Sequence, residues 1–179
     1  MEITILIFLL GGLFLGWSLG ANDAANVFGT AVGTRMVSFT TAAIICSVFV
    51  ILGAIISGAG TTETLGKLGA INALPGAFAA CVAAGISVYL MTKVGLPVST
   101  TQAIVGAIVG WNLYTGSSTN IQVLLTILST WILCPIIAGI IAMGLFTFTK
   151  RVILNRKLHI LRLDAYTRTA LLLAGAFGA

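Results

Sequence analysis

The chain alternates long apolar stretches with short polar interruptions. The apolar stretches cover residues 3–34, 37–57, 73–92, 94–113 and 121–149. Because a membrane-spanning helix needs about 20 apolar residues, most of these stretches are long enough to cross a bilayer. We therefore predict an all-α polytopic membrane protein in which residues 1–149 form one membrane unit.

Two of these stretches carry glycine and polar residues at membrane depth. Residues 20–23 read Gly-Ala-Asn-Asp, and we predict that the helix over residues 3–34 breaks there and restarts near Ala24. Residues 95–97 read Gly-Leu-Pro, and only a short apolar run follows them. We therefore predict either a broken crossing over residues 94–113 or a re-entrant hairpin, which requires that protein or a water-filled cavity surrounds its backbone.

Composition excludes the main soluble classes. The 179 residues are 59% hydrophobic and 7% charged, whereas a soluble domain carries roughly 25% charged residues. The three cysteines are too few for a secreted disulfide scaffold. Basic residues do not alternate with aromatic residues along one face, so we expect no nucleic-acid partner. What remains is a protein embedded in the lipid bilayer.

Basic residues predict the orientation of the chain. With the crossings above, every Lys and Arg except Lys67 falls on the same side of the membrane. By the positive-inside rule, the N-terminus and a 58–72 loop then face outside, and a basic 150–168 loop faces the cytoplasm. We expect the protein to be integral to the cell membrane, that is, the plasma or inner membrane.

The C-terminal residues 169–179 are apolar but too short to cross a bilayer. We expect them to be the start of a further membrane helix that is truncated here.

The polar segments predict a site for ions. An Asp at the centre of a membrane helix costs about 2.5 to 3.5 kcal/mol, and no Lys or Arg in either segment could pair with Asp23. A broken helix would let Asp23 and free carbonyls bind sodium or a proton, while half-helix N-termini bind an anion. In the second segment Pro97 suits a first helical turn, and residues 99–102 place three hydroxyls and an amide there. The plainer reading of those hydroxyls is helix capping.

Both segments resemble motifs of one family. Residues 20–26, Gly-Ala-Asn-Asp-Ala-Ala-Asn, followed by Gly29-Thr30 and Gly33, resemble the signature of the inorganic phosphate transporter (PiT) family. Residues 95–102, Gly-Leu-Pro-Val-Ser-Thr-Thr-Gln, resemble its second motif. The resemblance implies one half of an inverted-repeat secondary transporter, with discontinuous helices, residues 1–149 as the first repeat, and a missing C-terminal repeat. It implies symport of inorganic phosphate with sodium or protons, and no other cofactor.

The same resemblance implies roles for individual residues. The phosphate ligands would be Asn26, Ser99, Thr100, Thr101 and Gln102. The cation ligands would be Asn22 and Asp23, with sodium at Asp23.

Other functions stay open or are excluded. A sulfate permease of the same family would use similar donors, and a passive ion channel could also be built from helix breaks and small residues. An enzyme is not expected, because the single histidine, His159, lies far from Asp23 and Ser99 in the sequence. A homo-oligomer packed through the small residues of 53–60 is a further alternative.

Overall fold

A computed structural model describes residues 2–69, 74–155 and 159–178 of the chain. These residues form six helices: α1 (Glu2–Gly33), α2 (Phe39–Leu68), α3 (Leu74–Lys93), α4 (Thr100–Thr115), α5 (Ile121–Asn155) and α6 (Ile160–Gly178). Within the described residues, α1, α2, α3 and α5 are long and apolar enough to cross a membrane. The predicted all-α polytopic class is confirmed.

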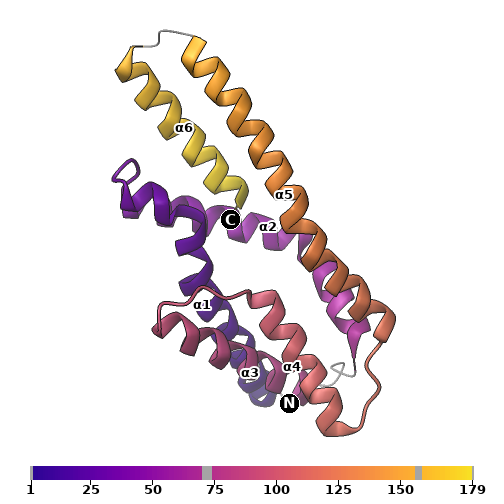
Figure 1. Cartoon of the computed structure of the whole chain (residues 1–179). Helices are drawn as coiled ribbons and strands as arrows, with labels where there is room; N and C mark the ends of the chain where they lie inside the picture. Colours follow the sequence, from indigo (N-terminus) through magenta and orange to yellow (C-terminus); the bar gives the residue numbers. More distant parts are fainter. Residues whose placement is uncertain (1, 70–73, 156–158, 179) are drawn as a thin grey trace.

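The helices form two groups that α2 and α5 connect (Figure 1). In the lower group, α3 packs against the first part of α1, and α4 packs against α3. In the upper group, α6 packs against α2 and the end of α1. Each group has a small apolar core, built around Leu68, Ala80, Val105 and Ile108 in the lower group and around Phe28, Ala31, Val37 and Ala42 in the upper group.

Close packing between α1 and α3 sets the position of the polar residues. The ring of Phe14 lies directly over Gly85, where an added Cβ would come within 2.7 Å of it. Further along both helices, the rings of Trp17 and Tyr89 are 5.6 Å apart. The two helices therefore run in the same direction, and this alignment brings Asn22 to the C-terminal end of α3.

The predicted break in α1 is wrong. Residues 20–23 are helical, and α1 continues without interruption from Glu2 to Gly33, although its ribbon bends along its length (Figure 1). A continuous helix keeps all its backbone hydrogen bonds within the segment, which a lipid environment favours. The polar side chains that suggested a break find partners on other helices instead.

The break at residues 95–97 is confirmed. Helix α3 ends in a Schellman motif, in which the N–H of Gly95 donates to Thr92 and the N–H of Leu96 donates to Met91. Gly95 has a φ of 76°, a left-handed conformation that glycine adopts without strain. The chain then passes through Pro97 before α4 begins at Thr100. We call residues 94–99, between α3 and α4, the link.

Three helices are longer than predicted. The predictions of loops at 58–72 and 150–168 are therefore wrong for most of these residues. Residues 58–68 extend α2, residues 150–155 extend α5, and α6 begins at Ile160 rather than at residue 169. Hydropathy marks only the apolar part of a helix, whereas Lys, Arg and Glu are also good helix formers. Residues 70–72 and 156–158 of the expected loops lie outside the described residues.

Local contacts stabilise these polar extensions. In α2, Lys67 donates to Glu63, four residues earlier, at 2.5 Å. In α6, Arg168 donates to Asp164 at 2.9 Å, and the His159 carbonyl accepts from the N–H of Leu163 at 3.1 Å. Both ion pairs are exposed to solvent, so each adds only weakly to the stability of its helix.

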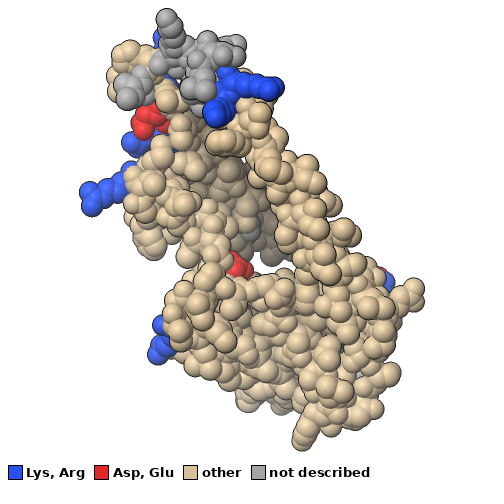
Figure 2. Space-filling view, in the orientation of Figure 1, with Lys and Arg blue, Asp and Glu red and all other residues tan. Residues whose placement is uncertain are grey.

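The outer surface is almost entirely apolar. No residue in the most apolar part of α5 is buried within the described structure. Figure 2 shows few charged side chains, and the blue Lys and Arg atoms gather mainly at the end of the molecule where α5 and α6 meet. An exposed apolar surface of this extent suits contact with lipid or with further membrane helices.

Candidate functional site

The candidate site lies where the middle of α1 meets the link between α3 and α4. Asn22 is 4% exposed, and its Nδ2 donates to the Val98 carbonyl at 2.6 Å. Its Oδ1 accepts from the N–H of Val98 at 3.4 Å and from the Thr92 hydroxyl at 3.3 Å. The second Nδ2 hydrogen is directed to Asp23 Oδ1, at 3.0 Å. Asn22 therefore connects α1 to the link by hydrogen bonds.

All hydrogen-bonding positions of the Asn22 amide are occupied in this arrangement. The amide nitrogen has two hydrogens and the oxygen has two lone pairs, and each of the four has a partner within the protein. In this conformation the side chain serves the contact with the link. Asn22 as a cation ligand stays a prediction.

Asp23 connects the two polar segments. Its Oδ1 accepts from Asn22, and its Oδ2 accepts from the hydroxyl of Thr100 at 3.2 Å. Thr100 is 9% exposed and is the first residue of α4. Because a carboxylate offers about four acceptor positions, these two bonds leave capacity for a cation. Among the described residues, neither ion pair involves Asp23, so its charge has no basic partner there.

The start of α4 presents a set of donors. Ser99 is the N-cap residue, and its Oγ accepts from the N–H of Gln102 at 3.3 Å. The side chains of Ser99, Thr101 and Gln102 are exposed. The first N–H groups of a helix have no partner within the helix and attract anions. The capping interpretation is thus correct for Ser99, and it leaves the other donors of this turn open.

Two pockets flank Pro97 and separate the predicted phosphate ligands. One, of about 390 Å³, is lined by Ser99 and Gln102 together with Ser87 and apolar residues of α3, the link and α4. The other, of about 220 Å³, is lined by Asn22, Asn26 and Thr92. The structure therefore brings Asn26 together with Asn22 but places it on the other side of Pro97 from Ser99 and Gln102.

Thr92 is not among the site residues that the two motifs predict. Its hydroxyl lies within hydrogen-bonding distance of two acceptors, Asn22 Oδ1 and, at 2.8 Å, the Val88 carbonyl of its own helix. A threonine near the end of an apolar helix usually makes only the second contact. The available signal was its position immediately before the Gly95 turn, at the same helix end as the second motif.

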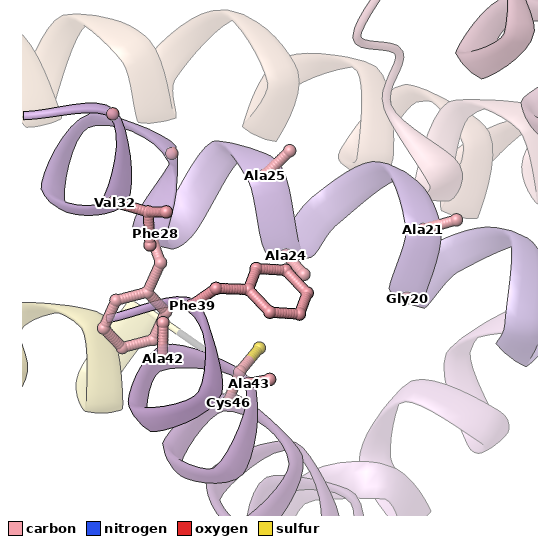
Figure 3. Close-up of a pocket in the computed structure, with 12 residues that line it drawn as sticks. Gly20, Ala21, Ala24, Ala25, Phe28, Val32, Phe39, Ala42, Ala43 and Cys46 are labelled. Carbon is pink, nitrogen blue, oxygen red and sulfur yellow. The ribbon is translucent and has the colours of Figure 1, made fainter. Parts of the chain in front are cut away.

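A larger pocket, of about 540 Å³, lies between α1 and α2. Its walls are Gly, Ala, Val and Phe residues with the thiol of Cys46 (Figure 3). Phe28 and Phe39 occupy one end of it, and Gly20 and Ala21 lie toward the other (Figure 3). An apolar lining of this kind does not compensate the charge of an ion, so the ion site is better placed at Asp23.

Comparison with known proteins agrees with the motifs. Residues 19–175 match the model of the phosphate transporter family. A protein of Pyrococcus furiosus named "Putative phosphate permease" is 37% identical over 164 residues, which cover 86% of this chain and 40% of that protein. A "Sodium-dependent phosphate transporter" of Plasmodium falciparum is 33% identical over 156 residues, 80% of this chain and 23% of that protein.

A solved structure has the same fold. It is named "The sodium-dependent phosphate transporter", is 26% identical, and superposes with a TM-score of 0.77 over 99% of this chain and 54% of that chain. The chain thus spans about half of the solved transporter and about 40% of the archaeal relative. With the family model matched over nearly the whole sequence, the chain belongs to the phosphate transporter family.

Proposed function

We propose that this chain forms part of a secondary active transporter that imports inorganic phosphate by symport with sodium. The observation that supports this most directly is the bond between Asp23 and Thr100, which joins the two motif segments at one place. A cation and an anion that bind at adjacent positions offset each other's charge, which is the usual arrangement in transporters of this type. The names of the relatives that mention sodium favour sodium over protons.

The cation is proposed to bind at Asp23. The carboxylate is half-buried, and the Asn22 amide and the Thr100 hydroxyl fix its orientation. Sodium prefers oxygen ligands, and the carboxylate still has free acceptor positions. A bound cation would also reduce the cost of holding an unpaired charge at membrane depth.

Phosphate is proposed to bind at the N-terminus of α4. The pocket of about 390 Å³ exposes Ser99 and Gln102, and Thr101 is exposed on the same first turn. Thr100 already donates to Asp23, so it would link the two ions. Asn26, on the far side of Pro97, would reach the same phosphate only after the link moves.

The α3–α4 pair is proposed to be a re-entrant hairpin. Its tip contacts α1 at Asn22, whereas α1 continues to Gly33. The helix rises about 16 Å between these two residues, roughly half the hydrocarbon thickness. The tip would then lie inside the membrane, and Lys93 would lie near the tip rather than on the cytoplasmic side.

The orientation of the chain rests on the remaining basic residues. Lys150, Arg151, Arg162 and Arg168 are exposed on α5 and α6, and this end of the molecule is proposed to face the cytoplasm of the cell membrane. The N-terminus would then face outside.

Uptake by the native-length protein in proteoliposomes tests the proposal. Labelled phosphate is offered with and without an inward sodium gradient, and with excess sulfate as a competitor. We expect uptake that depends on the gradient, resists sulfate, and is lost in Asp23→Asn. The matched control is Asp164→Asn, which removes a carboxylate from a surface ion pair on α6 and should leave uptake intact.

The same assay separates the alternatives. Uptake that sulfate abolishes would indicate a sulfate permease. Ion conductance without dependence on a sodium or proton gradient would indicate a channel. Gradient-driven uptake that persists in Asp23→Asn would place the cation elsewhere.

A further inference from the structure

A chain of hydrogen bonds joins the end of α3 to Asp23. The Thr92 hydroxyl donates to Asn22 Oδ1, and Asn22 Nδ2 donates to Asp23 Oδ1. The same Asn22 amide bonds to both the N–H and the carbonyl of Val98. Three parts of the molecule, the end of α3, the link and the middle of α1, therefore meet at a single buried side chain.

Thr92 has two acceptors for one hydrogen. Its Oγ1 lies 2.8 Å from the Val88 carbonyl and 3.3 Å from Asn22 Oδ1. The hydroxyl hydrogen points at one acceptor at a time. When it points at Asn22, it adds a second donor to the Oδ1 that also accepts from the Val98 N–H, and so it reinforces this orientation of the amide. The amide hydrogens of Asn22 are then directed at Val98 and Asp23.

We propose that Thr92 is a positioning residue for the cation-coupled step, because through Asn22 it orients the Asp23 carboxylate toward the N-terminus of α4. The proposal rests on the proposed symport function. Thr92 need not contact either ion. Its effect follows from fixing Asn22, which touches both Asp23 and the link.

The separation of the two pockets predicts a selective effect. The donors of Ser99 and Gln102 lie on α4 and line the pocket away from Thr92. Loss of the Thr92 hydroxyl should therefore disturb the cation at Asp23 more than phosphate at α4. A residue that matters only for folding would lower the amount of active protein without changing either affinity.

The experiment uses Thr92→Val in the native-length protein, with Thr92→Ser to restore the hydroxyl. The matched control is Thr62→Val on α2, whose hydroxyl makes the same bond to the carbonyl four residues earlier, Gly58, at 2.9 Å. Sodium half-saturation and the phosphate KM at saturating sodium are measured in proteoliposomes. We expect Thr92→Val to raise sodium half-saturation by about three- to tenfold, the range for one lost hydrogen bond.

The phosphate KM should stay nearly constant in Thr92→Val, and Thr92→Ser should behave like the wild type. The proposal is overturned if Thr62→Val has the same effect, if both affinities change equally, or if the serine variant fails to restore sodium affinity.

A second measurement does not depend on transport. Backbone hydrogen exchange over residues 94–99 should be faster in Thr92→Val than in Thr62→Val, because the N–H of Val98 loses a well-oriented acceptor. If the wild-type protein took up no phosphate, the proposed transport function would be contradicted. The exchange comparison would still decide whether Thr92 stabilises the link. Equal exchange in the two variants would overturn the positioning role itself.

Discussion

The two motif segments contain similar residues but adopt different backbones. Residues 20–26 remain helical, whereas residues 94–99 leave the helix. Both contain glycine and polar side chains at membrane depth, so composition does not explain the difference. The second segment contains Pro97, which has no N–H, and its neighbour Leu96 is restricted to extended conformations. The first segment has every backbone donor, and its helix remains intact.

The difference teaches that the two segments depend on each other. The open backbone of the link offers the Val98 carbonyl and N–H, and Asn22 on the intact helix binds both. The continuous helix α1 thus stabilises the non-helical link between α3 and α4 through Asn22.

Asn22→Ala should have the largest effect. It leaves the carbonyl and N–H of Val98 without their partner and removes one of the two donors to Asp23. We expect a loss of about 1 to 2 kcal/mol of stability, measured by thermal unfolding in detergent, together with loss of sodium-driven uptake. Asn26→Ala is the control for the stability measurement alone, since Asn26 is an exposed amide one turn further along α1. Equal unfolding temperatures in the two variants would contradict the role given to Asn22.

Much of the fold was predictable because its signals are local. Apolar runs located four spans, and the Gly95 and Pro97 pair located the break between α3 and α4. The continuity of α1 was not predictable in this way, because the group that satisfies Asn22 is a backbone carbonyl 76 residues away. When residues 20–23 are considered without the rest of the chain, their polar groups have no partners, and a break in the helix is the natural prediction.

The candidate site was predictable in its residues but not in its arrangement. The bond between Asp23 and Thr100 joins two residues that the sequence had assigned to different ions. The sequence also could not show that Pro97 separates Asn26 from Ser99, because that depends on the path of the link in space. Thr92 lay outside both motifs and was found only through its contact with Asn22.

Two glycine substitutions should have opposite signs if the backbones differ as described. Gly95→Ala forces a side chain into the left-handed conformation at φ 76° and should cost roughly 1 to 2 kcal/mol. Gly20→Ala lies within a continuous helix, where an added Cβ meets nothing within 4 Å, and should gain about 0.5 to 1 kcal/mol. Thermal unfolding of both variants in the same detergent measures the difference.

The outcome for Gly20→Ala decides how the first segment should be understood. A gain in stability with unchanged uptake agrees with a helix that stays intact throughout the transport cycle. A loss of stability similar to that of Gly95→Ala would show that residues 20–23 do break, as the sequence alone suggested.

The smallest expected effect concerns Ser18, one helical turn before Asn22. Its side chain is 1% exposed, and its Oγ is the buried side-chain atom that has no hydrogen-bond partner among the described residues. A buried hydroxyl without a partner loses its hydration, and no hydrogen bond within the protein compensates for that loss. Ser18→Ala should therefore be neutral or stabilising by up to about 1 kcal/mol. The control is Ser47→Ala on α2, because the Ser47 hydroxyl is exposed and bonded to the Ala43 carbonyl at 2.8 Å. If Ser18→Ala instead destabilised the protein as strongly as Asn22→Ala, the Ser18 hydroxyl would have a hydrogen-bond partner outside the described residues.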